Sequence, residues 1–394
     1  MQKTFDEIVL FARTGLNPRQ NFKLGQGKNK YVTIKNIMNN TLVIDSNTAV
    51  VDDEAIKFIH KRSQIKKGDI LFASIGRMGD MYIIEDEPEG WDINESVFAF
   101  TLDTSIVRQK YFYYIFRVKS TLDYLASNSS GSTFKSIKMN QLKKMVFDIP
   151  SLEEQDQIVA ALDRVCNVIE MRKQELISLD DLVKARFVEM FGDMYLNTME
   201  WREIDLETMA DIVSGITKGR KIAGKQLTKV PYMAVSNVKD GYIDWTTVKT
   251  IEATDQEINQ YRLLPDDVLM TEGGDPDKLG RGAIIRTPFE NCIHQNHIFR
   301  VRLDESHILP DYFAEYLKHQ RAKRYFLGCA KQTTGIASIN MKQLKALPVL
   351  LPPLELQNEF SAFIRQIDKS KAAVQKALDQ SQLLFDSLMQ NYFG

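Results

Sequence analysis

The sequence has 394 residues, of which 44% are hydrophobic and 26% charged, and its formal net charge at pH 7 is −1. At roughly 150 residues per domain this length predicts two to three domains, and the apolar fraction excludes disordered and collagen-like classes. We find no apolar run of about 18 residues and no basic segment leading into an apolar one at the start, so neither a membrane span nor a secretory signal is expected. The three widely spaced cysteines argue against a disulfide framework and suit a reducing, cytoplasmic location.

The first 150 residues mix short apolar runs with glycine and proline. Ile70–Ala73 and Val97–Leu102 predict strands, and residues 111–128, with an aromatic stripe, predict a helix that contributes to a core. Neither proline nor glycine occurs between Pro150 and Gly192, which predicts one long helix with glycine at its C-terminal cap.

The second half follows the same order. Residues 310–327 predict another aromatic-rich helix, and a second stretch without proline or glycine runs from Leu354 to Phe393. The predicted segments are a first globular domain at 1–150, a first spacer helix at 151–192, a second globular domain at 193–352 and a second spacer helix at 353–394.

The chain also repeats itself in sequence. Residues 136–143 return as 338–345, and residues 149–155 return as 351–357, both at an offset of 202. Weaker matches lie upstream in the same order, including Tyr31–Ile37 with Tyr232–Val238, Gly68–Leu71 with Asp266–Leu269, and Val97–Asp103 with Ile298–Asp304. Matches in one order and at nearly one offset predict a duplicated unit of about 200 residues rather than a coincidence of short apolar runs.

Each long stretch carries apolar residues at alternating steps of four and three. The first has Ile158, Leu162, Val165, Ile169, Leu176, Leu179, Val183 and Met190, and the second has Phe360, Ile364, Ile367, Val374, Leu378, Phe385, Leu388 and Tyr392. Arg172 and Arg186 interrupt the first pattern, and Lys371 and Ser381 interrupt the second. This spacing is typical of a coiled coil.

The duplication also predicts how these helices run. Two similar halves that pair about a twofold axis bring their helices together antiparallel, and helices of this length would span ~60 Å at ~1.5 Å per residue. We therefore predict an α+β protein in which two similar globular domains are separated by two long helices packed as an antiparallel coiled coil. The alternative is that the two helices lie on separate globular cores.

Positive charge gathers in the globular domains. Residues 1–150 carry a net charge of +4 and residues 201–352 one of +2, whereas residues 151–200 carry −6. Basic groups that cluster on one face let a near-neutral chain bind DNA, because lysine and arginine contact phosphates while arginine, asparagine and glutamine contact base edges. Two acid-free loops at matching places suit this role: Arg13, Arg19, Lys23, Lys28 and Lys30 in the first half, and Lys218, Arg220, Lys221 and Lys225 in the second. Solvated surface loops are the alternative.

Two further kinds of loop recur in both halves. Glycine-rich loops at 75–79 and 273–282 contain Arg77, Lys278 and Arg281, and glycine lets a backbone approach a polyanion closely. Loops rich in serine and threonine precede the repeated Ser136 and Ser338. Further DNA-binding candidates in and beside these loops, or on the segment before residue 298, are Lys135, Lys138, Lys331, Thr333, Thr334, Gln295 and Asn296. Plain turns are the alternative for both kinds of loop.

No catalytic constellation is apparent. The sequence lacks a phosphate-binding glycine loop, a Gly-x-Ser-x-Gly elbow and a Cys-x-x-Cys pair. Cys292, His294 and His297 form the one cluster of metal-capable side chains, and we expect a buried cysteine and hydrogen-bonded histidines there. Asp275 and Asp277 resemble a nuclease acid cluster only faintly, so a nuclease is the rival interpretation. We predict no catalytic residue, metal or cofactor in this chain.

The repeated motif resembles a known family. Leu142-Lys143 leading into Ile149-Pro150-Ser151-Leu152-Glu153-Glu154-Gln155 and a long helix, its copy in the second half, and Phe187–Asp193 at the end of the first helix are similar to the specificity subunit of type I restriction-modification systems. Residues 272–282 also resemble a loop of some target-recognition domains in that family.

This resemblance implies two target-recognition domains that each read one part of a split double-stranded DNA sequence. It implies helices that set the gap and dock two methyltransferase subunits, which use S-adenosylmethionine, together with ATP-driven restriction subunits. Candidate partner contacts lie on the polar helix faces, at Glu153, Glu154, Arg164, Arg172 and Arg186. The first domain lacks a counterpart of the insertion 275–280, and the two domains diverge strongly, which favours an asymmetric target. A two-headed coiled-coil scaffold without DNA binding is the alternative function.

Overall fold

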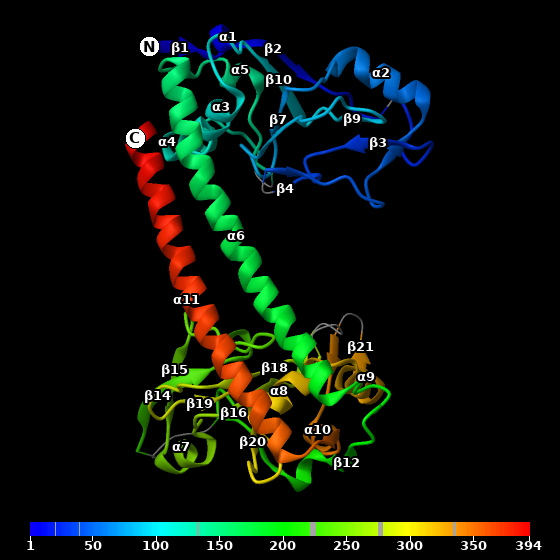
Figure 1. Cartoon of the computed structure of the whole chain (residues 1–394), viewed down its shortest axis with the longest axis vertical. Coiled ribbons are helices and arrows are strands. Elements are labelled where there is room, and N and C mark those ends of the chain that lie inside the picture. The colour runs from blue at the N-terminus through cyan, green and yellow to red at the C-terminus, as the bar shows by residue number, and fades with distance from the viewer. Residues whose placement is uncertain (20, 39, 132–133, 221–225, 275–278, 334–335) are drawn as a thin grey trace. The chain divides into compact units, whose positions relative to one another are not determined.

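A computed structural model describes residues 1–394 except 20, 39, 132–133, 221–225, 275–278 and 334–335 (Figure 1). The chain divides into two compact units, one formed by residues 1–172 with 377–394 and the other by residues 173–376. Each unit contains a globular part and a portion of each of two long helices. In the part of the chain that the structure describes, no helix is both long and apolar enough to cross a membrane.

The globular part of the first unit is built on a four-stranded antiparallel sheet in the order β2-β10-β7-β8. A second sheet has the order β6-β3-β9, in which β3 and β9 are parallel, and β1 pairs with β11. The elements are β1 (Gln2–Thr4), α1 (Phe5–Ile8), β2 (Val9–Thr14), β3 (Asn29–Val32), β4 (Ile37–Met38), β5 (Thr41–Leu42), β6 (Val50–Val51), α2 (Asp53–Ser63), β7 (Ile70–Ala73), β8 (Met81–Ile83), β9 (Trp91–Ile93), β10 (Val97–Leu102), α3 (Gln109–Ile115), α4 (Lys119–Ser127), α5 (Met139–Leu142) and β11 (Val146–Asp148).

The globular part of the second unit repeats this topology. Its four-stranded sheet has the order β13-β20-β16-β18, its sheet β15-β14-β19 again has one parallel pair, and β12 pairs with β23. The elements are β12 (Arg202–Asp205), η1 (Leu206–Thr208), β13 (Ala210–Ser214), β14 (Thr228–Met233), η2 (Val235–Asn237), β15 (Lys249–Ala253), α7 (Asp255–Tyr261), β16 (Asp267–Thr271), β17 (Gly273–Gly274), β18 (Gly282–Ile285), β19 (Ile293–His294), β20 (Ile298–Leu303), α8 (Pro310–Lys318), α9 (Gln320–Cys329), β21 (Lys331–Thr333), β22 (Ile336–Ser338), α10 (Met341–Lys345) and β23 (Pro348–Leu351). The predicted duplication is therefore present in the fold.

The predicted strands Ile70–Ala73 and Val97–Leu102 have the bounds that the sequence indicated. The two aromatic-rich helices do not run unbroken. Extended backbone at Val118 separates α3 from α4, and extended backbone at His319 separates α8 from α9. Neither break has a proline or glycine signal; a change of direction there lets both helices of each pair turn an apolar face to the same core, as buried Phe112 and Leu125 do in the first unit.

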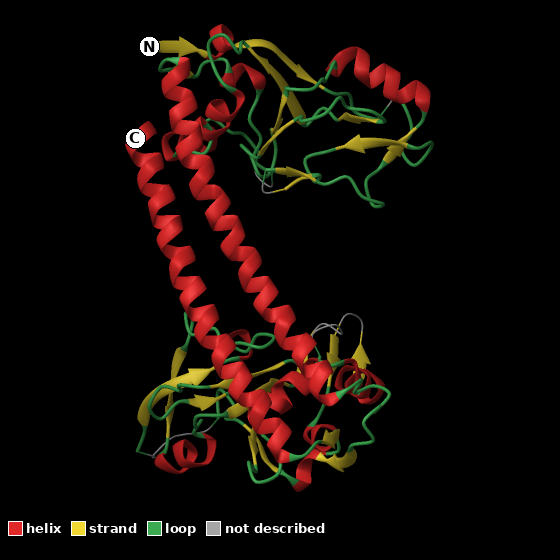
Figure 2. Ribbon diagram, in the orientation of Figure 1, coloured by secondary structure: helices red, strands yellow, loops and turns green. Residues whose placement is uncertain are grey.

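The two long helices are α6 (Leu152–Phe191) and α11 (Leu354–Phe393), each of 40 residues (Figure 2). Each begins within two residues of a proline, and α6 ends at Gly192, whose φ of +75° suits a glycine cap. Every apolar position of the predicted heptad pattern is buried or half-buried. The prediction of two long amphipathic helices is confirmed.

Within each unit the helices pack antiparallel, and both contribute to the core. In the first unit, Leu162 of α6 and Phe385 of α11 belong to one buried apolar cluster with the sheet. In the second unit, Phe187 of α6 and Phe360 of α11 do the same, with ring centroids 5.5 Å apart. The predicted antiparallel packing of the two long helices is therefore confirmed within each unit, and both helices also pack on the globular core.

Three of the four polar residues that interrupt the heptad pattern bond across the helices, whereas Arg186 bonds to Glu189 on its own helix. Arg172 of α6 donates to the carbonyl of Ala377 and the hydroxyl of Ser381 on α11. Lys371 of α11 forms an ion pair with Asp180 of α6. Such polar layers fix the register of a helix pair at some cost in stability.

The first turn of each long helix is held by a buried glutamine. Gln155 Oε1 accepts from Arg108 N–H at 2.8 Å, and its Nε2 donates to the carbonyls of Ile106 and Pro150 at 2.9 and 3.0 Å. Gln357 makes the same three bonds in the second unit, accepting from Leu309 N–H and donating to His307 and Pro352. This network fixes where each helix starts against its own domain.

We expect Gln357→Leu to destabilise the chain by about 3 kcal/mol, because one N–H and two carbonyls would lose their buried partner. Urea unfolding of the full chain measures this. The control is Asn358→Ala, the adjacent exposed residue whose amide bonds only within the helix. Equal effects of the two substitutions would contradict the role of the glutamine.

A glycine after β2 and another after β13 allow close approach to a neighbouring strand. A Cβ on Gly15 would lie 1.7 Å from Ile93 O, and one on Gly215 would lie 1.9 Å from His294 O. Both positions are therefore closed to any side chain in the present backbone.

We expect Gly215→Ala to cost about 2–3 kcal/mol, since the backbone must move to relieve the clash. Gly328→Ala is the matched control in α9, where an added Cβ meets nothing within 4 Å. That change should stabilise the chain by up to about 1 kcal/mol, because alanine favours a helix. Thermal unfolding of both variants tests the difference; a neutral Gly215→Ala would contradict it.

Candidate nucleic-acid interface

The glycine-rich loop and the serine and threonine loop meet in each unit. In the first unit, Ile75 bridges to Ser136, and Gly76 N–H donates to Lys135 O at 3.1 Å. In the second unit, β17, β22 and β21 form one small sheet in which Gly273 and Lys331 both pair with Ser338. Loops that the sequence identified separately thus form one surface in each unit.

A third loop joins the same edge. Ser74 N–H donates to Ser96 O at 3.1 Å, and at the equivalent place Glu272 N–H donates to His297 O at 3.0 Å. The predicted residues Gln295 and Asn296 lie on this third loop and are half-buried. Gln295 Oε1 accepts a weak hydrogen bond from Val235 N–H at 3.4 Å.

Several predicted basic residues are exposed on these loops. Lys135 and Lys138 flank the segment Ser136–Ile137, with Lys138 at the start of α5, and Arg77 lies on the glycine-rich loop with Nε 3.6 Å from Asp80. Lys331 is exposed on the hairpin of the second unit, and Arg281 is half-buried. Sequence reasoning missed Phe134, which is 70% exposed next to Lys135; an aromatic residue within a polar, basic loop was the signal.

The acid-free loop of the first unit divides into two kinds of residue. Arg13 lies within the sheet, where it pairs with buried Asp69 at 2.8 Å and donates to Gln64 O at 2.6 Å. Lys30 donates to Asp45 O at 2.9 Å. Arg19, Lys23 and Lys28 are exposed. The exposed side chains remain candidates for DNA contact, whereas Arg13 has a structural partner.

The corresponding loop of the second unit is described only in part. Lys218 is exposed, and Arg220 forms a bidentate pair with Glu257. The Arg220 hydrogen bond lowers the pKa of Glu257 to about 2. Thr333 lies in β21. Lys221, Lys225, Lys278 and Thr334 lie outside the described residues, as do Asp275 and Asp277.

A family model described as the type I restriction modification DNA specificity domain matches residues 2–180 and 199–381. The chain belongs to this family. The two matches correspond to two specificity domains with one topology.

Relatives and solved structures agree with that assignment. The chain is 23% identical over 282 residues to the type I restriction enzyme EcoKI specificity subunit of Escherichia coli, which covers 68% of this chain and 60% of the relative. It is 26% identical over 196 residues to the putative MjaX specificity subunit of Methanocaldococcus jannaschii, covering 49% and 45%. The chain thus spans 60% or less of these relatives.

Two solved structures share the fold. The type I restriction-modification S subunit of M. genitalium aligns with a TM-score of 0.56 at 16% identity, covering 100% of this chain and 96% of the other. A chain from a structure on complex assembly of the type I restriction-modification system gives a TM-score of 0.59 at 17% identity, covering 99% and 96%. At these identities the likeness shows the fold alone.

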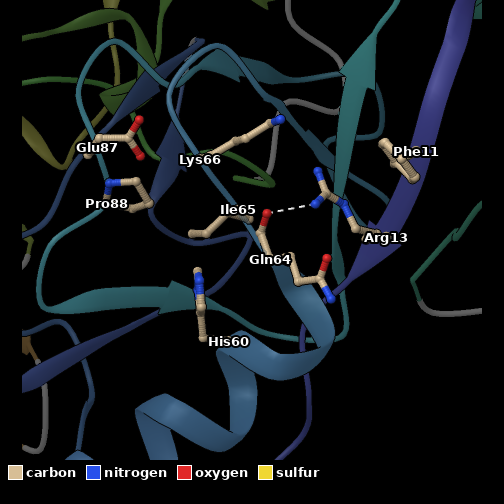
Figure 3. Close-up of a pocket in the computed structure, with 8 residues that line it drawn as sticks. All are labelled: Phe11, Arg13, His60, Gln64, Ile65, Lys66, Glu87 and Pro88. Carbon is tan, nitrogen blue, oxygen red and sulfur yellow. Dashed lines mark hydrogen bonds between the residues drawn. The ribbon is translucent and has the colours of Figure 1, made fainter.

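The first specificity domain also has a pocket of about 460 Å³ that none of the residues of these three loops lines (Figure 3). Figure 3 shows Arg13 donating to the backbone of Gln64 at its wall. His60 at its edge contacts Asp92, with Nδ1 and Oδ2 3.0 Å apart, and burial raises the pKa of that carboxyl. These contacts hold α2 against β9, so we assign them a structural role.

Cys292 and His294 of the cysteine and histidine cluster are part of the core of the second specificity domain, whereas His297 is exposed. Burial raises the pKa of Cys292 to about 12 and lowers the pKa of His294 to about 4. The His294 ring nitrogens face the carbonyls of Tyr261 and Val213 at 3.1 and 3.2 Å. Among the described residues, no group of three or more His, Cys, Asp or Glu side chains is placed to hold a metal ion.

We expect His294 to make the chain sensitive to acid. Its folded pKa lies below the unfolded value of 6.5, so its contribution is fully present above pH 6.5 and is lost as the pH falls toward 4. The loss is about 3 kcal/mol, at about 1.4 kcal/mol per pH unit. Urea midpoints measured between pH 7 and pH 4 check this.

His294→Ile should flatten that dependence, because buried Ile93 occupies the equivalent position in the first specificity domain. His307→Ala removes an exposed histidine and serves as the control. An unchanged acid dependence in His294→Ile would show that other groups cause it.

Proposed function

We propose that this chain is the DNA-recognition subunit of a type I restriction-modification complex and reads a two-part double-stranded sequence. The observation that carries the proposal is the duplicated specificity domain. Each copy brings three loops together at one edge and presents exposed lysine there, Lys135 in the first copy and Lys331 in the second. Lysine and arginine supply phosphate contacts, and the polar side chains beside them supply base contacts.

The two half-sites are unlike under this proposal. The backbone topology of the domains is the same, but loop residues differ at matching places, where Ile75 and Lys135 of the first domain correspond to Gly273 and Ala337 of the second. Because base edges are read by side chains, unlike loops favour an asymmetric target.

The partners follow from the same proposal. Methyltransferase subunits would dock on the long helices and use S-adenosylmethionine, restriction subunits would use ATP, and this chain would supply recognition without catalysis. Several apolar side chains on α6 and α11 are exposed, as a protein partner would need: Met171, Ile177, Leu182, Val188, Leu383 and Leu384. Glu153, Glu154 and Arg164 are exposed on α6, whereas Arg172 bonds to α11 and Arg186 to Glu189.

The test expresses the chain with the methyltransferase subunits of its host and maps methylated bases with and without it. A single two-part motif that appears only with the chain supports the proposal. Methylation without such a motif, or none at all, would overturn it. A protein-interaction scaffold would produce no motif and no steep salt dependence of DNA binding.

We expect the double substitution Lys135→Ala and Lys138→Ala to weaken DNA binding of the complex for all sequences alike. The salt slope of log K should fall by about 1 for each lysine that contacts a phosphate. Lys57→Ala, on an exposed face of α2, is the matched control. Fluorescence anisotropy on a duplex at several salt concentrations measures binding by both variants. A salt slope that is unchanged in the double variant would contradict phosphate contact by Lys135 and Lys138.

A further inference from the structure

At the edge where the three loops meet, one position makes the same backbone hydrogen bonds in both specificity domains but carries different side chains. Ser74 follows β7 and Glu272 follows β16, and each donates its N–H to the third loop at 3.1 and 3.0 Å. The carbonyl of Ser74 accepts a hydrogen bond from Ile137 N–H at 2.9 Å, and the carbonyl of Glu272 accepts one from Ile339 N–H at 2.8 Å. A difference in what the two edges bind at this point therefore comes from the side chains.

In the first domain the side chain at this position is buried and cannot contact a ligand. Ser74 is 3% exposed, and its hydroxyl donates to Ser96 O at 2.7 Å. In the second domain it presents an acid and an imidazole, since the side chains of Glu272 and His297 are 34% and 57% exposed and lie 2.6 Å apart. The pair is thus an accessible feature of the second domain alone.

Hydrogen bonds fix the orientation of these two side chains and assign the donor and the acceptor. His297 Nδ1–H donates to Glu272 Oε2, and Asn296 Nδ2 lies 3.4 Å from the other ring nitrogen, to which it donates. Among the described residues, Glu272 Oε1 accepts no hydrogen bond. The imidazole therefore orients a carboxylate whose second oxygen has no donor among the described residues and can accept a hydrogen bond from outside the protein.

A carboxylate on a DNA-facing edge selects strongly among its ligands. It repels phosphates, and because it has only acceptors it cannot pair with guanine or thymine, whose major-groove edges present acceptors. Adenine offers the N6 amine, but the acceptor N7 lies beside it. Cytosine offers the N4 amine with no acceptor on its own major-groove edge, and acceptance by Glu from cytosine N4 is a known mode of base recognition.

We propose that Glu272, with His297 as its positioning residue, accepts a hydrogen bond from N4 of a cytosine in the half-site read by the second specificity domain. This inference rests on the proposed function and adds the base class that one residue reads. The first domain, with Ser74 at this point, has no such contact.

The experiment uses the complex purified through a tag on the full chain and a duplex DNA library randomised over both half-sites. We expect wild type to select cytosine at one position of one half-site by about ten- to a hundredfold. Glu272→Gln should lose that preference or shift it toward adenine, which an amide can bond through N6 and N7. Glu272→Ser, which copies the first domain, should leave the position unselected, with all other positions unchanged.

Histidine 297 is tested by a pair of variants. His297→Ala should weaken the cytosine preference, and His297→Asn should restore it, because its amide can still donate to Glu272. Glu290→Gln, an exposed acid of the same domain, is the control and should change nothing.

Each other outcome counts against a stated claim. Cytosine selection that survives Glu272→Ser, or a uniform loss of binding to all sequences, overturns the inference while the proposed function stands. A wild-type complex that selects no sequence overturns the proposed function itself. Thermal unfolding of each variant separates loss of contact from loss of fold, and the Gln variant keeps the shape of the side chain if the Ser variant is unstable.

Discussion

The buried glutamine at the first turn of each long helix is the contact on which the rest of the arrangement depends. Gln155 and Gln357 bond the start of a helix to the segment that precedes α3 or α8 in the same unit. A helix is stiff, so fixing its first turn also fixes the direction in which its apolar face points. That face then meets the other helix with Arg172 beside Ser381 and Lys371 beside Asp180.

Duplication has preserved backbone-binding side chains and changed surface-facing ones. Asn36 and Asn237 make the same three hydrogen bonds after β3 and β14, one accepted from a backbone N–H and two donated to a carbonyl and a threonine hydroxyl. Tyr111 and Tyr312 both donate to the last strand before the long helix. A frame held by such internal bonds tolerates new residues on its loops, so one fold can carry two different loop surfaces.

The sequence predicted the duplication, the long helices and the strands at 70–73 and 97–102, because repeats and hydrophobic periodicity are local signals. It did not predict the breaks at Val118 and His319, since packing on the sheet decides them without a proline or glycine. The charge pattern predicted both Lys135 and Arg13 as DNA-binding candidates. Only the fold distinguishes them, because Lys135 is exposed whereas Arg13 is bonded to buried Asp69. The Glu272–His297 pair joins residues 25 apart, and no spacing rule brings them together.

The hydrophobic core of the first unit depends on the last residues of the sequence. Residues 377–394 belong to it, and Phe385 and Met389 are buried in its core although some two hundred residues separate them from the rest of that core. During synthesis on the ribosome, the first globular domain is therefore complete only after the second has been made. Loss of the residues from about 377 onward would leave the second globular domain intact, although that domain is adjacent in sequence. The same loss would expose the buried core of the first globular domain.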